Sequence, residues 1–433
     1  MISLIVVLAI AISIGLGYRT KINTGFFAMA FAYIIGCFVL NLKPAEVIRM
    51  WPVSIFYVIF AVSLFYNFAL VNGTLEKLAA HLLYGCRKFP HMLPLAIFFA
   101  ATLIAGLGAG FFTVMAFMAP LSLMLCDKTG ISKMTGAMAV NYGALAGANF
   151  MTSQSGIIFR SLIKGAGYSD AAAFAYTTSI FGATMVIPLV VLSALILFSR
   201  RQTSTADVLH IEKPAAFDQK QRLTLYLIVL MMAIVLAAPV LHSVLPGNKT
   251  IGLLNSKMDI GLLAILFSVV ALLLKLGDEK KVIANVPWST LIMICGVGML
   301  ISVAIKAGTI KILASWIGVN VPSFLVPIAM CIVGGIMSFF SSTLGVVTPA
   351  LFPIVPSIVS ATGINPMLLF TCIVIGAQAT AISPFSSGGS MSLGACPDDD
   401  DRAQLFPQLL FRAVPLCLSS SAVMSIILAF IIG

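Results

Sequence analysis

Charged side chains are scarce in this sequence: Asp, Glu, Lys and Arg together make up 9% of its 433 residues, against about 25% in soluble domains. Hydrophobic residues make up 60%, and apolar runs close to the ~20 residues that cross a bilayer recur along the whole chain. These runs do not alternate in the way that the ~10-residue strands of a membrane barrel do. The composition therefore excludes a soluble globular protein and predicts an all-α polytopic membrane protein.

Acidic residues are fewer than basic ones, 14 against 25, and none of them lies in the middle of an apolar run. A proton relay built on a buried Asp or Glu therefore has no candidate. The P-loop pattern GxxxxGK[ST] is absent, and so are HExxH, GxSxG and a buried pair of Asp residues. These absences argue against an ATPase and against an intramembrane enzyme, and we expect no cofactor.

The net charge of +11 does not indicate a nucleic-acid partner, because the basic residues occur singly or in pairs between apolar runs. This pattern suits membrane loops that face anionic lipid headgroups. One set of loops carries 17 of the 25 Lys and Arg residues and is predicted to be cytoplasmic. We therefore expect a multi-pass protein surrounded by lipid, with both termini outside.

Two halves of the chain resemble each other. Residues 51–79 align without gaps on residues 286–314, a shift of 235, with nine of 29 positions identical. Four small residues farther along recur at a shift of 233: Gly130, Gly143, Ser153 and Gly156 match Gly363, Gly376, Ser386 and Gly389. Such a constant shift predicts two homologous halves, residues 1–199 and 223–433, joined by a polar cytoplasmic linker over residues 200–222.

Each half is predicted to contain five transmembrane helices, one of them broken, and a re-entrant hairpin. The hairpins are expected at about 90–128 and 322–361, and the broken helices at about 134–164 and 366–395. Because five is an odd number, the second half must enter the membrane upside down. Inverted repeats with broken helices are typical of secondary transporters, whose substrate site lies where the repeats meet.

Polar residues interrupt the apolar sequence at equivalent places in the two halves, TSQSG at 152–156 and SPFSSGG at 383–389. Backbone that leaves a helix inside a bilayer costs several kcal/mol per unpaired group, so it survives only within protein or around a ligand. Hydroxyl and carbonyl oxygens can hold Na⁺, and the start of each resumed helix offers N–H groups and positive dipole to an anion. The hairpin tips add two further helix starts. The sequence therefore predicts that both breaks and both tips form one site for a small anionic solute.

The predicted substrate-binding residues fall into four groups, two at the hairpin tips and two at the breaks: Gly110, Phe112 and Thr113; Ser341, Ser342 and Thr343; Thr152, Ser153, Gln154, Ser155 and Gly156; and Ser383, Pro384, Ser386, Ser387, Gly388 and Gly389. Na⁺ is a candidate coupling ion, and its candidate ligands are Thr113, Ser153, Ser342, Thr343 and Ser386. No catalytic residue is predicted.

Four further polar residues carry two interpretations each. Asn141, Asn149 and Gln378 flank the breaks and either line the site or bond between helices. Arg160 lies eight residues beyond Thr152, about 12 Å along a helix, and either contacts a carboxylate or extends to the membrane interface. The breaks themselves also have a second interpretation, in which Ser and Gly only permit close helix packing.

The order of these elements resembles the ion transporter superfamily, in particular its divalent-anion/sodium symporters. The return arm of each hairpin carries a proline, Pro120 and Pro349, and a polar break follows in the next span. Ser341-Ser342-Thr343 is similar to the Ser-Asn-Thr tip of that family, and Ser383-Pro384 partly matches its Thr-Pro-Pro-Asn break. The chain as a whole looks closer to bacterial dicarboxylate carriers of the malonate-carrier type.

This resemblance implies a small dicarboxylate substrate such as malonate or a C4 acid, a bacterial inner membrane, a homodimer and an elevator-type movement. The leading hypothesis is therefore a gradient-driven dicarboxylate transporter. A transporter of another solute in the same superfamily, such as an inorganic oxyanion, citrate or an exported cation, is the alternative. A membrane scaffold or enzyme is a third hypothesis, from a different class.

Overall fold

The computed structural model describes residues 2–20, 22–85, 92–199, 213–244, 248, 250–251, 253, 257–309, 312, 320–339 and 341–432. Within these ranges every regular element is a helix and no strand occurs, so the predicted all-α class is confirmed. Seven of the described helical segments are long and apolar enough to cross a membrane: Pro44–Val71, Leu93–Thr129, Asp170–Leu197, Gln219–Ala237, Trp288–Lys306, Thr343–Thr362 and Asp399–Ile432.

The first half of the chain forms ten α-helices among the described residues: α1 (Ile2–Thr20), α2 (Thr24–Tyr33), α3 (Pro44–Ile48), α4 (Val53–Val71), α5 (Thr74–Gly85), α6 (Leu93–Ile104), α7 (Gly110–Thr129), α8 (Lys133–Ala148), α9 (Gln154–Gly165) and α10 (Asp170–Ser199). A π-helical turn, η1 (Ile34–Val39), extends α2, and another, η3 (Ala105–Ala109), joins α6 to α7.

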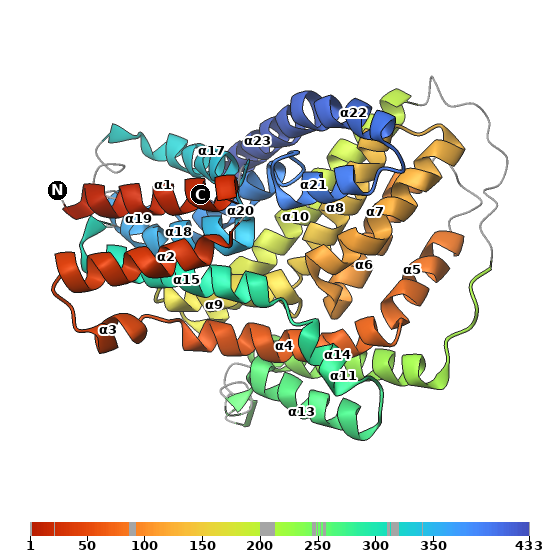
Figure 1. Ribbon diagram of the computed structural model, residues 1–433, viewed down its shortest axis with the longest axis horizontal. Coiled ribbons are helices and arrows are strands. Elements are labelled where there is room, and N and C mark those ends of the chain that lie inside the picture. Colours follow the sequence, from red (N-terminus) through yellow and green to blue (C-terminus); the bar gives the residue numbers. More distant parts are fainter. Residues whose placement is uncertain are drawn as a thin grey trace.

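The second half follows a similar order: α11 (Gln219–Val244), α13 (Ile260–Leu273), α14 (Glu279–Ala284), α15 (Trp288–Lys306), η4 (Ser323–Leu325), α17 (Val326–Phe339), η5 (Thr343–Val347), α18 (Thr348–Leu351), η6 (Phe352–Ile354), α19 (Val355–Thr362), α20 (Pro366–Ala379), α21 (Ser387–Gly394), α22 (Asp399–Gln408), η7 (Leu409–Ala413) and α23 (Val414–Ile432). In Figure 1, α4, α11, α13 and α14 lie along the lower edge, and α17, α22 and α23 lie along the upper edge.

The segments in which hairpins and broken helices were predicted contain paired helices. Residues 90–128 hold α6 and α7, and residues 322–361 hold α17 followed by the turn that leads into η5, α18 and α19. The two predicted broken helices consist of α8 with α9, and of α20 with α21. Residues 200–212 of the predicted linker lie outside the described residues, and residues 213–218 form no helix.

Glycine in the left-handed region sets the reversal at the first hairpin tip. Gly108 has φ 100° and Gly110 has φ 70°, values that a residue with a Cβ rarely adopts. Gly130 ends α7 with φ 70°, and Gly363 ends α19 with φ 72°. These two equivalent glycines therefore place α8 and α20 after the same kind of turn.

Close packing through glycine recurs in both halves. A Cβ at Gly143 of α8 would overlap the carbonyl oxygen of Phe98 in α6, and one at Gly376 of α20 would overlap that of Cys331 in α17. The two glycines and the two carbonyls are each 233 residues apart. Small residues that let backbones approach are the usual means by which membrane helices associate. The α6–α8 and α17–α20 pairs are thus built by the same contact.

The two halves also exchange partners. Gly25 of α2 packs against Ile292 and Met293 of α15, whereas Gly261 of α13 packs against Tyr57 and Val58 of α4. Residues 292 and 293 follow residues 57 and 58 by 235. Each half therefore places its second apolar helix on the third apolar helix of the other half, which interlocks them.

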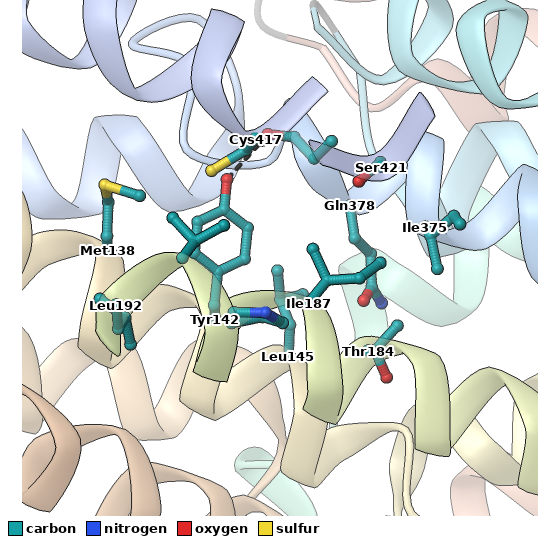
Figure 2. Close-up of a pocket in the computed structure, with 13 residues that line it drawn as sticks. Met138, Tyr142, Leu145, Thr184, Ile187, Leu192, Ile375, Gln378, Cys417 and Ser421 are labelled. Atoms are coloured by element: carbon teal, nitrogen blue, oxygen red, sulfur yellow. Dashed lines mark hydrogen bonds between the residues drawn. The ribbon is translucent and has the colours of Figure 1, made fainter. Parts of the chain in front are cut away.

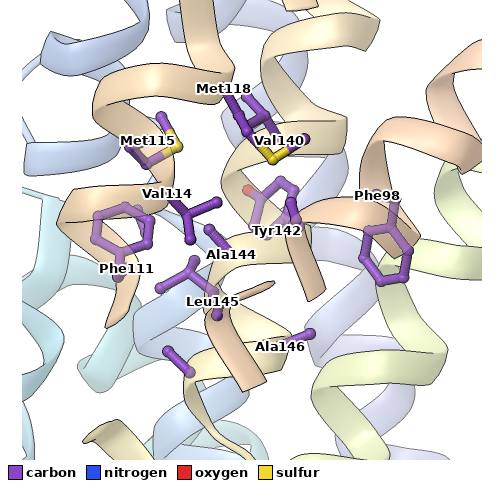
Figure 3. Packing of buried hydrophobic residues seen from close by; sticks show 14 of the residues in the cluster. Phe98, Phe111, Val114, Met115, Met118, Val140, Tyr142, Ala144, Leu145 and Ala146 are labelled. Carbon is purple, nitrogen blue, oxygen red and sulfur yellow. The ribbon is translucent and has the colours of Figure 1, made fainter. Parts of the chain in front are cut away.

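An apolar core holds the first hairpin against α8. Phe98 of α6, Phe111 and Met115 of α7, and Val140 and Leu145 of α8 are all buried in one cluster. Figure 3 shows these side chains gathered between the three helices. The hairpin tip is thereby fixed beside the first break, which begins three residues after Ala146.

Replacing Gly376 by Ala should weaken the α17–α20 contact, because the added Cβ would overlap the Cys331 carbonyl. Overpacking of this kind typically costs about 1–3 kcal/mol. We expect a lower midpoint of thermal unfolding for the detergent-purified protein. The matched control is Gly182→Ala in α10, where nothing lies within 4 Å of the added Cβ; equal midpoints for the two variants would contradict the packing argument.

Candidate functional site

Non-helical backbone occurs at both predicted interruptions, but each time three residues earlier than predicted, at 149–153 and 380–386. The last three residues of each predicted interruption instead form the first turn of the resumed helix. α8 ends at Ala148 and α9 begins at Gln154, while α20 ends at Ala379 and α21 begins at Ser387. The residue before each resumed helix is an extended serine, Ser153 with φ −92° and ψ 172°, and Ser386 with φ −98° and ψ 171°. The two breaks thus resume their helices with nearly the same backbone geometry.

These two serines do not cap the helices that follow them. The Ser153 hydroxyl donates to the carbonyl of Ala105 at 2.6 Å, and the Ser386 hydroxyl donates to that of Ala381 at 2.6 Å. Both hydroxyls therefore satisfy carbonyls of unwound or tip backbone. The first N–H groups of α9 and α21 therefore donate no hydrogen bond to these two side chains. They can still donate to another acceptor, such as a bound anion.

Each resumed helix folds back on its own break through a glycine. A Cβ at Gly156 would overlap the carbonyl oxygen of Phe150, and one at Gly389 would overlap that of Ser383. Phe150 and Ser383 are 233 residues apart. Without a side chain at these positions, the first turn of the helix can approach the break closely.

One pocket, here called the tip pocket, collects residues from both hairpin tips and the second break. Its lining consists of Phe111, Phe112, Leu145, Ser338, Ser341, Ser342, Thr343, Leu344, Ala381, Ser386, Ser387 and Gly388. Seven of the predicted site residues therefore lie together: Phe112, Ser341, Ser342, Thr343, Ser386, Ser387 and Gly388. None of the lining side chains is charged.

A second pocket, here called the flank pocket, adjoins the first hairpin tip on the side of α4. It is lined by Val62, Ser63, Tyr66, Asn67, Gly108, Ala109, Phe112, Thr113, Gln154, Asn285 and Pro287. Phe112 lines both pockets, so the pockets adjoin at this residue. A Cβ at Gly110 would overlap Oε1 of Gln154, which places the Gln154 amide directly against the tip.

Four helix starts meet at these two pockets. The tip pocket holds the starts of η5 and α21, the flank pocket holds the start of α9, and the start of α7 reaches both. Free N–H groups and the positive end of the helix dipole make each start a favourable place for an anion. The arrangement offers positive potential without any basic side chain.

The remaining predicted site residues line neither pocket. Ser155, Gly156, Ser383, Pro384 and Gly389 are buried beside the breaks. Ser383 accepts a hydrogen bond from the backbone N–H of Phe385 at 3.2 Å. Ser383 and Pro384 belong to the unwound backbone, whereas Ser155, Gly156 and Gly389 lie in the first turns of α9 and α21.

Thr152 lies deeper in the first break and is nearly inaccessible. Its carbonyl accepts a hydrogen bond from the Tyr66 hydroxyl at 3.1 Å, and its own hydroxyl has no partner among the described residues. Tyr66 also covers the first tip, since a Cβ at Gly108 would overlap its ring. A residue of α4 thereby contacts both the first break and the first tip.

Asn149 and Gln378 bond to each other. The Asn149 amide donates to Oε1 of Gln378 at 2.9 Å, the Gln378 amide donates to Oδ1 of Asn149 at 3.0 Å, and Asn149 also donates to Thr184 at 3.0 Å. Tyr142 adds a parallel link by donating to the carbonyl of Ala379 at 2.7 Å. These bonds join the two broken helices across the boundary between the halves.

A small cavity lies behind these links, between α8, α10, α20 and α23. Figure 2 shows Tyr142, Gln378 and Thr184 on its wall beside Leu145, Ile187 and Ile375. Because its lining is largely aliphatic, this cavity is a poor place for a charged solute.

Asn141 and Arg160, the other two predicted residues, take up separate positions. Asn141 is fully buried, both its amide nitrogen and oxygen lack a partner among the described residues, and its oxygen lies against Gly388. Arg160 pairs with Asp170 through two hydrogen bonds and lies over the ring of Phe174, 5.5 Å from its centroid. Arg160 lines a separate, larger cavity.

Tyr66 and Tyr142 are not among the residues predicted from the sequence to form the site. Their only signal is a hydroxyl in the middle of an apolar helix. The candidate Na⁺ ligands Ser153 and Ser386 lie at different breaks, and Thr113 lines the flank pocket while Ser342 and Thr343 line the tip pocket. Among the described residues, no group of three or more His, Cys, Asp or Glu side chains is placed to hold a metal ion.

Comparison with known proteins gives one family and one fold. A family model described as the N-terminus of the dicarboxylate carrier protein MatC matches residues 1–148 and 249–381. The crystal structure of the YdaH transporter of Alcanivorax borkumensis matches with a TM-score of 0.57 at 16% identity, covering 92% of this chain and 88% of that one. No curated protein matches the sequence. The family model and this solved structure are both of transporters.

Breaking the amide pair should loosen the link between the two broken helices. In Gln378→Ala, the buried Asn149 amide loses a partner, which typically costs about 1–3 kcal/mol. We expect a lower midpoint of thermal unfolding for this variant. The double variant Asn149→Gln with Gln378→Asn exchanges the two side chains and should recover at least half of that decrease. Thr362→Ala, which removes a partly buried hydroxyl bonded only within α19, is the control. An unchanged midpoint in Gln378→Ala would refute the role of the pair.

Proposed function

We propose that the chain, which belongs to the family of the dicarboxylate carrier protein MatC, is a secondary active transporter of a small dicarboxylate such as malonate or a C4 acid. The observation that carries the proposal is the convergence of helix starts from both halves on the tip and flank pockets. No acidic side chain lines either pocket, so an anion meets positive dipole ends and hydroxyl donors there.

Two pockets on either side of Phe112 suit a solute with a negative group at each end. We assign one carboxylate to the tip pocket, where Ser342, Thr343 and Ser387 present hydroxyls beside the starts of η5 and α21. The other carboxylate is assigned to the flank pocket, beside Thr113 and Gln154. Such a division would favour short dicarboxylates over monocarboxylates, because a single negative group fills only one of the two positions.

Asn141 adds a reason to place a polar ligand at the start of α21. A buried amide without partners costs about 1–3 kcal/mol, and the Asn141 side chain lies against Gly388 in the first turn of that helix. A carboxylate held at the first turn of α21 would give this amide a partner through a bridging water. The cost of the unpaired group would then be recovered on binding.

An inverted repeat is part of the proposal. Its support is the recurrence of the same glycine–carbonyl contacts at a shift of 233 and the exchange of partners between α2, α15, α13 and α4. The two stretches matched by the family model end at residues 148 and 381, which are also 233 apart. The odd number of spans in each half would then turn the second copy upside down.

The elevator-type movement assigns the hairpins and broken helices to a moving body and α2, α4, α13 and α15 to a scaffold. The Asn149–Gln378 and Tyr142–Ala379 bonds support this division, because they join the broken helices of both halves. The Tyr66–Thr152 bond would be one contact that the movement has to break. A homodimer in a bacterial inner membrane, with both termini outside, completes the proposal.

Sodium is the proposed coupling ion. The hydroxyls of Thr113, Ser342 and Thr343 lie at the two hairpin tips, and each can offer an oxygen to a hard cation. The hydroxyls of Ser153 and Ser386 donate hydrogen bonds to carbonyls and so keep oxygen lone pairs available. Coupling to Na⁺ would neutralise part of the charge of a bound dianion during its passage.

The purified protein should be reconstituted in liposomes and assayed for uptake of radiolabelled malonate and succinate, with an inward Na⁺ gradient or with K⁺ in its place. We expect saturable uptake of at least one dicarboxylate and a stimulation of at least about tenfold by Na⁺. The Ser342→Ala variant should reduce uptake severalfold, because it removes a hydroxyl of the tip pocket that also caps η5.

Ser360→Ala is the matched control, since Ser360 is exposed near the end of α19 and bonds only to Pro356. Uptake of citrate or an inorganic oxyanion, with no uptake of any short dicarboxylate, would overturn the substrate assignment while keeping a transporter. Equal uptake in the Ser342→Ala variant and the native protein would overturn the assignment of the tip pocket.

A further inference from the structure

A fourth cavity, larger than the tip and flank pockets, lies between α4, α9 and the starts of α10 and α13. Its volume is about 690 Å³. Arg49, Arg160, Lys164, Asp170 and Asp259 contribute the charges of its lining. The rest of the wall is formed by Trp51, Pro52, Val53, Ser54, Ile55, Val58, Met151, Ile157, Ser161, Gly165, Val235, Met258 and Ile260. We call this space the α4–α9 cavity.

The charges of the cavity are unequally compensated. Asp170 is shared, because it pairs with Arg160 and also with Lys164 at 3.1 Å. The Asp259 carboxylate accepts the backbone N–H of Leu262 at the start of α13. The wall therefore carries three basic side chains and two carboxylates. Asp170 has a single negative charge for two basic partners, Arg160 and Lys164. The cavity keeps an excess of positive charge at its wall.

The α4–α9 cavity and the flank pocket follow the same pair of helices. Along α4, Ser54 and Val58 line the cavity, and Val62 and Tyr66, one and two turns farther, line the flank pocket. The order reverses along α9, where Gln154 lines the flank pocket and Arg160 and Lys164 line the cavity. Arg160 follows Gln154 by six residues, about 9 Å of helix. The two spaces therefore lie one after the other along the same pair of helices.

The first break reaches the cavity wall through Met151. This residue lies between Asn149, which bonds to Gln378, and Thr152, which bonds to Tyr66. A solute that enters the cavity thus arrives beside unwound backbone of the proposed site. No residue of the second break lines the cavity.

We infer that the α4–α9 cavity is the access vestibule of the transporter and that Arg160 and Lys164 form a capture site for a carboxylate on its path to the flank pocket. This inference rests on the proposed function for the identity of the carboxylate. A cleft with apolar walls and one sign of excess charge concentrates ions of the opposite sign. A dianion is concentrated more strongly than a monoanion, so the vestibule contributes to substrate choice.

Asp170 limits the strength of capture. It holds Arg160 and Lys164 in place while cancelling part of their charge, so the arriving carboxylate meets an oriented but weakened site. Passage requires binding that is favourable enough to enter and weak enough to leave. Neutralising Asp170 should therefore strengthen capture, whereas neutralising either basic residue should weaken it.

The charge of the vestibule can be tested without knowing the substrate. Met151→Cys places a thiol on the vestibule wall, and its rates of modification by an anionic and a cationic methanethiosulfonate are compared in whole membranes, with the native chain as the background. We expect the anionic-to-cationic rate ratio to fall about threefold or more with Lys164→Gln or Arg160→Gln, and to rise with Asp170→Asn. Raising the salt concentration should reduce these differences.

Lys306→Gln is the matched control, because Lys306 is a comparably exposed lysine that pairs with Glu46 and does not line the cavity. Lys164→Gln keeps the inference testable if Arg160→Gln fails to fold, since the Lys164 side chain is half exposed. An unreactive thiol at position 151, or a rate ratio that Lys164→Gln and Asp170→Asn leave unchanged, would overturn the inference.

Transport kinetics separate this inference from the proposed function. In liposomes, Lys164→Gln should raise the KM for malonate severalfold with little change in kcat, and should make KM less dependent on salt. A native protein that carries no dicarboxylate, yet shows the charge-dependent thiol ratio, would refute the proposed substrate and retain the vestibule. Native transport with an unchanged KM in Lys164→Gln would refute the capture site and retain the proposed substrate.

Discussion

The constraint on which this structure depends is that backbone unwound inside a membrane must find partners within the protein. Two helices are interrupted, and each interruption frees carbonyls and N–H groups that lipid cannot satisfy. The protein satisfies several carbonyls with hydroxyls: Ser386 bonds to Ala381, Ser153 bonds to Ala105 of the tip, and Tyr66 and Tyr142 bond to Thr152 and Ala379. The first residues of the two resumed helices line the flank and tip pockets, and a helix start is a favourable place for a negatively charged solute.

The bonds that support the breaks are not symmetric, although the packing around them is. The glycine contacts recur at a shift of 233, but Asn149 corresponds to Ile382 and Gln378 corresponds to Leu145. Tyr66 likewise corresponds to Ile301 at the shift of 235. Packing contacts that recur in both halves are therefore combined with polar side chains that occur in only one half. This asymmetry allows the two faces of the proposed site to differ: the polar side chains of the tip pocket are all hydroxyls, whereas the flank pocket combines hydroxyls with amides.

The positions of the breaks and tips could be predicted from the sequence, because Gly, Ser and Pro are the residues that end a helix or turn it sharply. The resemblance of the chain to dicarboxylate carriers agrees with its family match. The orientation of individual side chains could not be predicted. In a helix that is apolar on all sides, no periodicity indicates which face is buried, so Tyr66 and Tyr142 gave no sign of their partners.

The same lack of a polar face explains why only part of the predicted site lines the pockets. Ser153 and Ser383 hydrogen-bond backbone groups near the breaks, whereas Ser342, Thr343 and Ser387 face the tip pocket. Spacing alone does not separate these two uses of a serine. The partner of Arg160 could not be predicted either. Its ion pair with Asp170 joins α9 to the start of α10, and no periodic pattern in the sequence indicates such a contact.

The central claim is that unwound segments of both halves bind one and the same anion. It is tested most directly by protection from modification, with single cysteines introduced as Gln154→Cys at the first break and Ser387→Cys at the second. The account predicts that malonate slows the modification of both thiols, with the same half-maximal concentration. Protection of only one thiol, or different half-maximal concentrations for the two, would contradict a shared site.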